Sequence, residues 1–408
     1  MPLTSEHRWE RPLATAVGVL LAALMLGCGA ASAPAAESRT ELGFVLPPGL
    51  IDSTQDSNGE MRAESFRVAA RAGDRIRTAI KWSDVQPRCR LIRSGSYRWS
   101  RPDQIMRLFV EEGVRQLLTL NGTPGCAAAR GNPSFEPRGR YVDEFGRFAR
   151  AALERYGPGG TFFDRYPELA GRCCAVEMIE IWNEPNLGKK WSRADPQAYA
   201  RFFKRVAATI HAARNWTPRV RLVTGGVTGL NGGPWPTNGR DFVRGMYRVD
   251  GFRSAADRIG IHTYSPTAKS AMRALRSVRR IMRRHHHSAP IVISEHGWST
   301  CPRPSAERSN GKCVSPRGQA NRLKTYARRL LAERNRRLRV ESFLWFMSQD
   351  VARPAGVGDC RTSPKNFYGF FDFWGAAKPA WSVWRRLTGT SGPRRLSRSA
   401  QDFGCRGG

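Results

Sequence analysis

The stretch 179–185, Ile-Glu-Ile-Trp-Asn-Glu-Pro, decides the fold of this 408-residue chain. The apolar run 176–182 is typical of a buried strand. It ends abruptly at Asn183-Glu184, because Pro185 cannot donate a hydrogen bond to a neighbouring strand. Glu184 is therefore expected at the carboxyl end of a core strand, where α/β folds build their functional sites.

A second strand of the same kind ends 111 positions after Glu184: the apolar residues 291–293 lead into Ser294 and Glu295, and His-Gly-Trp follows. Two glutamates that each end an apolar strand predict the two-carboxylate chemistry of glycoside cleavage. In its retaining form, one carboxyl protonates the leaving oxygen and the other attacks the anomeric carbon, with about 5–5.5 Å between them. The acid is expected to have a raised pKa, because apolar and aromatic neighbours disfavour its charged form.

Strand and helix patterns alternate along the chain, which favours an α/β fold with a parallel sheet. The predicted strands are 42–46, 76–80, 114–120, 176–182, 220–227, 258–264, 291–295 and 340–346. The predicted helices are 64–72, 104–112, 141–156, 195–215, 241–247, 271–284, 319–336 and 380–387. Eight strands alternating with eight helices predict a single-domain (β/α)8 TIM barrel over residues 37–388, followed by an irregular basic tail at 389–408. The two glutamates then end strands four and seven, which lie across the barrel from each other.

These motifs resemble those of the clan A retaining glycoside hydrolases, most closely families 5 (cellulase-like) and 39. Trp-Asn-Glu-Pro at 182–185 is similar to their acid/base motif, and Ser-Glu-His-Gly-Trp at 294–298 to their nucleophile motif. The resemblance covers about residues 42–388 and implies that Glu184 is the acid/base and Glu295 the nucleophile. Two ordinary polar residues at strand ends are the alternative.

The resemblance extends to residues around the two glutamates. It implies that Asn183 bonds the sugar 2-hydroxyl and that Arg77, inside the second strand, steadies Glu295. A structural salt bridge is the alternative for Arg77, because a buried arginine needs an anion in any case. His262 and Tyr264, which end the sixth strand, resemble a His-x-Tyr pair whose tyrosine bonds the nucleophile. For His262 a packed core position is the alternative.

Three further residues are expected to line the substrate site. Asn121 ends the third strand at the same rim. Trp345 ends the eighth strand, and its indole face is suited to stack on the apolar face of a pyranose. Trp298 is expected to extend the groove. Core packing is the alternative for both tryptophans.

The first 36 residues have the pattern of an export signal. Arg8 and Arg11 precede an apolar segment at 13–27, and small residues follow at 30–36. The apolar segment is shorter than the roughly 20 residues that span a membrane. Secretion after cleavage near Ala35 or Ala36 is expected. Lipidation at Cys28, which would anchor the protein at the outer cell surface, is the alternative.

Eight cysteines remain when Cys28 is set aside, and an even number in an exported chain predicts disulfides. Cys301 and Cys313 bracket a polar loop and are the expected pair. The neighbours Cys173 and Cys174 are expected to bond to different partners. No Cys-x-x-Cys pair is present, and the glycosidase chemistry requires neither a metal nor another cofactor.

The charge is strongly positive, with 67 Lys and Arg against 34 Asp and Glu, a net charge of +33. Such a balance predicts attraction to anionic surfaces, an acidic cell-wall polymer included, although an Arg-rich genome bias is the alternative. No nucleic-acid-binding signature accompanies it, so no nucleic-acid partner is expected. The sequence therefore predicts an exported, monomeric retaining β-glycoside hydrolase with a β-linked oligo- or polysaccharide as substrate. A catalytically silent glycan-binding barrel and a basic scaffold for anionic polymers are the alternatives.

Overall fold

The computed structural model describes residues 39–46, 64–232, 238–300, 313–333, 337–350, 367–372 and 374–396. The expected signal segment with Cys28, and the end of the basic tail, lie outside these residues. None of the helices that the structure describes is both long enough and apolar enough to cross a membrane.

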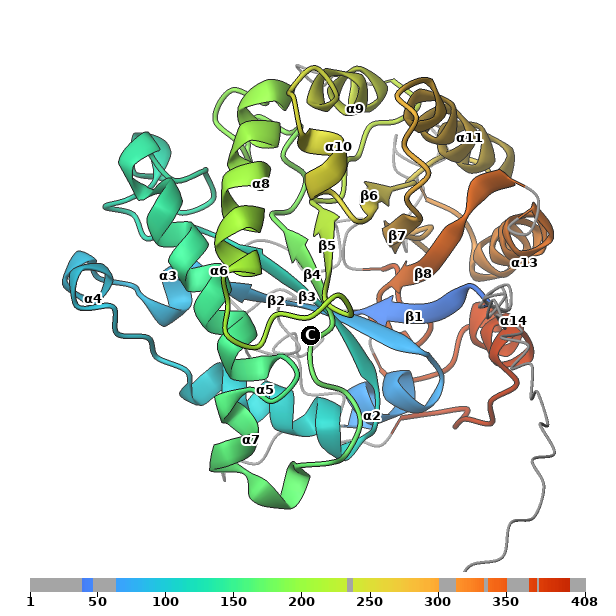
Figure 1. Cartoon of the computed structure of the whole chain (residues 1–408). Helices are drawn as coiled ribbons and strands as arrows, with labels where there is room; N and C mark the ends of the chain where they lie inside the picture. Colours follow the sequence, from blue (N-terminus) through green and yellow to red (C-terminus); the bar gives the residue numbers. More distant parts are fainter. Residues whose placement is uncertain are drawn as a thin grey trace, which may run out of the picture. The chain divides into compact units, whose positions relative to one another are not determined.

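Eight parallel strands form the sheet, in the order β5-β4-β3-β2-β1-β8-β7-β6. Its two ends meet through isolated bridges that pair Val223 with Arg258 and Val227 with Ile261. The strands therefore close into a barrel (Figure 1). Their bounds are β1 Glu41–Val45, β2 Arg75–Lys81, β3 Arg115–Asn121, β4 Met178–Ile181, β5 Arg221–Thr224, β6 Ile259–His262, β7 Ile291–His296 and β8 Val340–Phe346.

Helices connect successive strands and surround the barrel (Figure 1), which confirms the predicted (β/α)8 TIM barrel. Asp195 caps one of them as the sequence indicates, because its carboxylate accepts from the backbone N–H groups of Gln197 and Ala198. The helices are α2 Glu64–Arg71, α3 Trp82–Val85, α4 Cys89–Ser94, α5 Ser100–Glu111, α6 Val142–Tyr156, α7 Thr161–Arg165, α8 Pro196–His211, α9 Gly239–Met246, α10 Phe252–Ala255, α11 Ala268–Arg284, α13 Pro316–Glu333 and α14 Pro379–Thr388.

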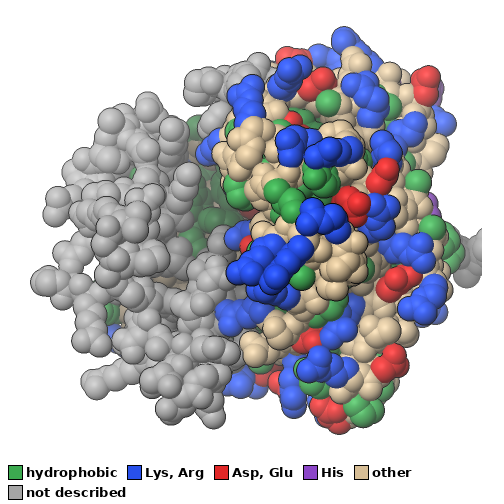
Figure 2. Space-filling model, turned by 90° about the vertical axis from the view of Figure 1, so that its left-hand side faces the viewer, with side chains coloured by type: hydrophobic (Ala, Val, Ile, Leu, Met, Phe, Trp, Pro, Cys, Tyr) green, Lys and Arg blue, Asp and Glu red, His purple; other side chains and the backbone are tan. Residues whose placement is uncertain are grey.

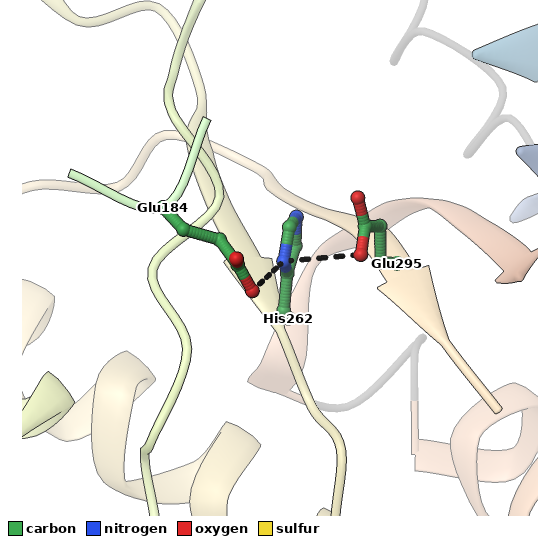
Figure 3. Close-up of side chains that lie close together, drawn as sticks. All are labelled: Glu184, His262 and Glu295. Carbon is green, nitrogen blue, oxygen red and sulfur yellow. Dashed lines mark hydrogen bonds and ion pairs between the residues drawn. The ribbon is translucent and has the colours of Figure 1, made fainter. Parts of the chain in front are cut away.

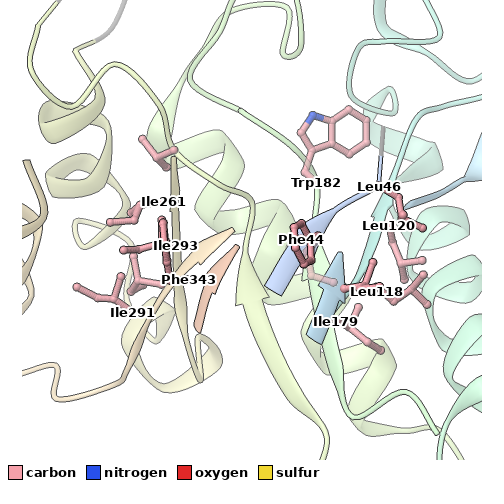
Figure 4. Close-up of a cluster of buried hydrophobic side chains, with 14 of the residues drawn as sticks. Phe44, Leu46, Leu118, Leu120, Ile179, Trp182, Ile261, Ile291, Ile293 and Phe343 are labelled. Carbon is pink, nitrogen blue, oxygen red and sulfur yellow. The ribbon is translucent and has the colours of Figure 1, made fainter. Parts of the chain in front are cut away.

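Alternation along the strands divides their apolar side chains between two cores. The outward-facing set packs against the helices, and Figure 4 shows part of it, from Phe44 on β1 to Phe343 on β8. The inward-facing set fills the barrel axis with one residue from each of six strands: Val45, Leu117, Met178, Val223, Val292 and Leu344. This inner layer closes the barrel, so the polar residues above it lie at the carboxyl ends of the strands.

Two disulfides are present among the described residues. Cys89 at the start of α4 is bonded to Cys126 after β3. Cys173 is bonded to its neighbour Cys174, so the prediction of different partners is wrong. The two Cα atoms lie 3.7 Å apart, and Cys174 adopts a left-handed φ of 93° in the turn that brings the sulfurs together. The predicted Cys301–Cys313 bond stays a prediction, because Cys301 lies outside the described part of the chain.

The surface is basic but not uniform. Figure 2 views the side at the left of Figure 1, which carries α4, α6 and α8, and there Lys and Arg are interspersed with Asp and Glu. Several of these charges are paired, as in the ion pairs Arg147–Glu144 and Arg150–Glu154 on α6.

Candidate active site

The two predicted glutamates meet at the carboxyl ends of β4 and β7. Glu184 is the third residue after the end of β4, whereas Glu295 lies inside β7, where the pairing register shifts relative to both neighbouring strands. Such a bulge redirects side chains that simple alternation would send to opposite faces. As a result Ser294 and Glu295 both point into the barrel, where Ser294 Oγ donates to Glu180 and Glu295 accepts from Arg77.

His262, the last residue of β6, lies between the two carboxylates (Figure 3). Its Nδ1 atom is 3.2 Å from Glu184 Oε1 and 3.4 Å from Glu295 Oε2. A carboxylate oxygen of Glu184, one of Glu295 and a ring nitrogen of His262 all lie within 4.8 Å of one another. The carboxylates are thus too close for the roughly 6.5–9.5 Å arrangement of an inverting glycosidase and fit the retaining arrangement.

Arg77 on β2 links three acceptors from below the site. Its guanidinium donates to Glu295 Oε1, to Asn183 Oδ1 and to Glu180 Oε2, each over 2.6 Å. Burial acts against its charge, but Glu180 and Glu295 outweigh burial, so the pKa of Arg77 is raised. The predicted contact between Arg77 and Glu295 is therefore present, and Asn183 is fixed by the same fork.

Glu180 is a buried charge that sequence reasoning did not single out as a site residue. It is 0% exposed and accepts hydrogen bonds from Arg77, from Thr119 Oγ1 over 2.7 Å and from Ser294 Oγ over 2.7 Å. Side chains from β2, β3 and β7 thus converge on one carboxylate of β4. A charged residue in the middle of an apolar strand was the available signal, because such a group needs partners inside the fold.

Tyr264 completes the hydrogen bonding of Glu295, as its hydroxyl donates to Oε2 over 3.0 Å. Burial raises the pKa of this phenol well above its ordinary value, so it remains a donor at neutral pH. The Tyr264 ring lies edge-to-face against Phe346 and Tyr368, with ring centroids 6.2 and 5.6 Å away. These three rings form an aromatic wall beside Glu295.

Glu184 and His262 shift each other's pKa. Burial raises the pKa of Glu184, but the hydrogen bond and charge of His262 and the cations Lys190 and Lys189 outweigh it, so the pKa is lowered. This result contradicts the expected raised pKa. Burial lowers the pKa of His262, but Glu295 and Glu184 outweigh burial and raise it. These two shifts favour an ionised Glu184 beside a protonated His262.

Two glycines after β5 let these residues approach. A Cβ at Gly225 would lie 2.8 Å from the carbonyl oxygen of Trp182. A Cβ at Gly226 would lie 2.0 Å from His262 Nε2. Trp182 and Glu184 themselves have left-handed φ angles of 76° and 49°, a strained backbone typical of functional sites. The close packing against β5 holds that strained strand end in place.

The structure places two predicted site residues, Trp345 and Trp298, differently, whereas Asn121 ends β3 as expected. Trp345 is 0% exposed, and its ring stacks on Phe370 with centroids 4.9 Å apart, so the predicted sugar platform is contradicted. Strand alternation is the reason, because Trp345 faces the helices and the next residue, Phe346, faces the barrel interior. Trp298 is 2% exposed and its indole N–H donates to Ser265, which indicates packing. Asn121 Oδ1 is buried without a hydrogen-bond partner among the described residues.

Glu184, His262 and Glu295 are also the group of described residues that could hold a metal ion. A cation bound there would engage both carboxylates and the Nδ1 atom that now bridges them. The oxygen and nitrogen donors suit several divalent metals. The glycosidase chemistry itself uses the two carboxylates directly.

Comparison of the sequence with protein-family models finds no match, and comparison with curated proteins finds none either. Solved structures do match. A family 39 glycoside hydrolase from Bacteroides cellulosilyticus WH2 superposes with a TM-score of 0.59 at 19% identity, over 86% of this chain and 64% of that protein. A family 39 β-xylosidase from Caulobacter crescentus gives 0.57 at 20% identity, over 87% and 72%. The chain has the fold of these glycoside hydrolases.

A third solved structure matches as well. An exo-β-1,4-mannosidase from Opitutaceae bacterium strain TAV5 superposes with a TM-score of 0.55 at 14% identity, over 86% of this chain and 59% of that protein. The resemblance that the two glutamate motifs predicted is therefore confirmed at the level of the fold. At these identities the comparison shows the architecture, and the activity must be argued from the site.

Proposed function

We propose that this protein is a retaining β-glycoside hydrolase that acts by double displacement. Glu184 is the acid/base and Glu295 the nucleophile. The observation that supports this most directly is the approach of their carboxylate oxygens to within 4.8 Å at the open end of the barrel. That spacing allows one carboxyl to attack the anomeric carbon while the other serves the leaving oxygen.

Each surrounding residue has a part in this reaction. Arg77 and Tyr264 donate to the two oxygens of Glu295, which favours the ionised carboxylate that attacks. Asn183, fixed by Arg77, is directed to the sugar 2-hydroxyl. His262 supplies a proton to Glu184 along their 3.2 Å hydrogen bond when the leaving oxygen arrives. Once the glycosyl–enzyme has formed, Glu184 is the base that activates water.

A β-linked oligo- or polysaccharide is the proposed substrate. The aromatic wall of Tyr264, Phe346 and Tyr368 offers apolar surface for a sugar ring. The named neighbours include a β-xylosidase and an exo-β-1,4-mannosidase. The protein is proposed to act outside the cell as a monomer without a cofactor, either free or lipid-anchored at Cys28.

The test is reducing-sugar release from β-glucans, mannans, xylans and acidic wall glycans. The wild type is compared with Glu295→Ala, Glu184→Gln and a control, Glu111→Gln, on the outer surface of α5. Release by the wild type and the control, with none from the two active-site variants, is the expected result. Azide added to Glu295→Ala should restore turnover and give an α-glycosyl azide, because it replaces the missing nucleophile from the same face.

Three outcomes would oppose the proposal. If the folded wild type binds glycan but releases no reducing sugar from any substrate of the panel, a catalytically silent glycan-binding barrel would be favoured. Undiminished release by Glu295→Ala would assign the chemistry to other residues. Tight, salt-sensitive retention on anionic polymers that is indifferent to Glu184→Gln, without turnover, would favour a basic scaffold.

A further inference from the structure

Two neighbouring helices, α11 and α13, carry many cations and pack against each other on the outside of the barrel (Figure 1). Helix α11 contains seven Lys or Arg and no acid, and α13 contains five Lys or Arg and one acid, Glu333. Helices α5 and α6, by contrast, together contain five Arg and five Asp or Glu. The two helices α11 and α13 together contribute +11 of the net charge of +33, whereas the charges of α5 and α6 cancel.

Most of the cations on α11 and α13 are exposed and have no acidic partner in the part of the chain that the structure describes. On α11, Arg273 and Arg280 are two turns apart and Arg284 follows one turn later, so the stripe is about 16 Å long. On α13, Lys324 and Arg328 are one turn apart on the solvent side. The basic face, as we call it, consists of Lys269, Arg273, Arg280, Arg283, Arg284, Arg317, Lys324, Arg328 and Arg329.

The Arg residues of α5 and α6 provide the contrast. Arg107, Arg147 and Arg150 form ion pairs with acids of their own helices, over distances of 3.0 Å or less. Their charge is already neutralised locally, whereas that of the basic face is left for an external partner. Like charges in such rows repel one another, so an anion bound along them reduces an electrostatic repulsion that already exists in the free protein.

The basic face also contains a recess. A hollow of about 380 Å³ opens on α13, lined by Asn321, Lys324, Thr325, Arg328 and Arg329. Three cations there stand beside an amide and a hydroxyl, which can bind both an oxyanion and the neighbouring hydroxyl groups of a sugar. This combination suits an acidic glycan better than an isolated small ion.

We propose that the basic face binds an acidic polysaccharide that carries repeating carboxylate or phosphate groups. Guanidinium groups pair with both oxyanions in a bidentate manner, and two rows of cations match a chain with repeated charges. Single-stranded nucleic acid is disfavoured, because its binding surfaces stack bases on exposed rings, and the one aromatic residue of α11 and α13, Tyr326, is buried. The assignment does not depend on the proposed catalysis.

The chemistry is tested with the full-length chain and three labelled probes: polygalacturonate, a poly(glycerol phosphate) and single-stranded DNA. Affinities are measured by fluorescence anisotropy at 50, 150 and 500 mM NaCl. The test variant replaces Arg273, Arg280, Lys324 and Arg328 with Gln. A control variant replaces Arg107, Arg147, Arg150 and Arg205 with Gln, which changes the net charge equally; Arg205, on α8, is likewise paired with an acid, Asp143. Thermal unfolding verifies that both variants fold.

The test variant should bind at least one of the two glycan-type probes about thirtyfold more weakly, because each exposed ionic contact changes the affinity by a factor of about two to three. The control variant should bind as the wild type does. Preference between polygalacturonate and poly(glycerol phosphate) then identifies the oxyanion. Equal losses in both variants would overturn the proposal, as would wild-type binding that is tighter to DNA than to both other probes.

Discussion

Substituting Gly226 by Ala tests whether the position of His262 controls the reaction. The new Cβ would lie 2.0 Å from His262 Nε2 and 2.8 Å from Ser294 Oγ. The ring must shift by about 1.4 Å to restore an ordinary contact of 3.4 Å. His262 Nδ1 is only 3.2 and 3.4 Å from the two carboxylates, so the shift must disturb the Glu184–Glu295 pair.

A misplacement of about 1 Å in a catalytic group can lower a rate by about 100-fold. We therefore expect Gly226→Ala to reduce kcat/KM by about that factor on whichever substrate the panel identifies. Overpacking should also lower the free energy of unfolding by about 1–3 kcal/mol, which still leaves a folded protein to assay. Steady-state kinetics and urea denaturation measure the two effects separately.

Gly139→Ala is the matched control. Gly139 has open space where a Cβ would be, and its φ is not in the left-handed region. This variant should retain wild-type kinetics and stability. The reasoning would be refuted if folded Gly226→Ala also kept kcat/KM within about threefold of the wild type, because the His262 ring would then not set the active geometry.

Three other changes have defined outcomes. His262→Leu removes the hydrogen bond and the charge that lower the pKa of Glu184, so the pKa of this carboxyl should rise in a carbon NMR titration. A pKa that falls would contradict the assignment. Arg77→Lys replaces a guanidinium that donates to three acceptors with a single ammonium group. Urea denaturation should show that the free energy of unfolding falls by about 3–5 kcal/mol. A fall below about 1 kcal/mol would mean that the network is dispensable. Cys89→Ser removes the disulfide to Cys126, which closes a loop of 37 positions. The chain-entropy model predicts that the free energy of unfolding falls by about 4 kcal/mol. An unchanged denaturation midpoint would contradict this stabilising role of the disulfide.

The sequence was sufficient for the architecture and for the two glutamates. Hydrophobic periodicity and helix-start signals such as Asp195-Pro196 act between residues close in the chain, so they can be read without a structure. The end of the apolar run at Trp182 predicted Glu184 at a strand end in the same way, from residues close in the chain. Arg77, His262 and Tyr264 were also predicted near Glu295, and all three contact it in the structure.

Only the tertiary structure decided which side chains face the barrel interior. The bulge in β7 turns Glu295 inward, and strand alternation places Phe346 inside but Trp345 outside. Both results depend on pairing with strands distant in sequence, so a shift of one residue reverses the face. The position of Glu180 at the convergence of three strands, and the lowered pKa of Glu184, arise from groups brought together by that closure. Local pattern thus determined which residues end the strands, whereas their orientation and charge required the closed barrel.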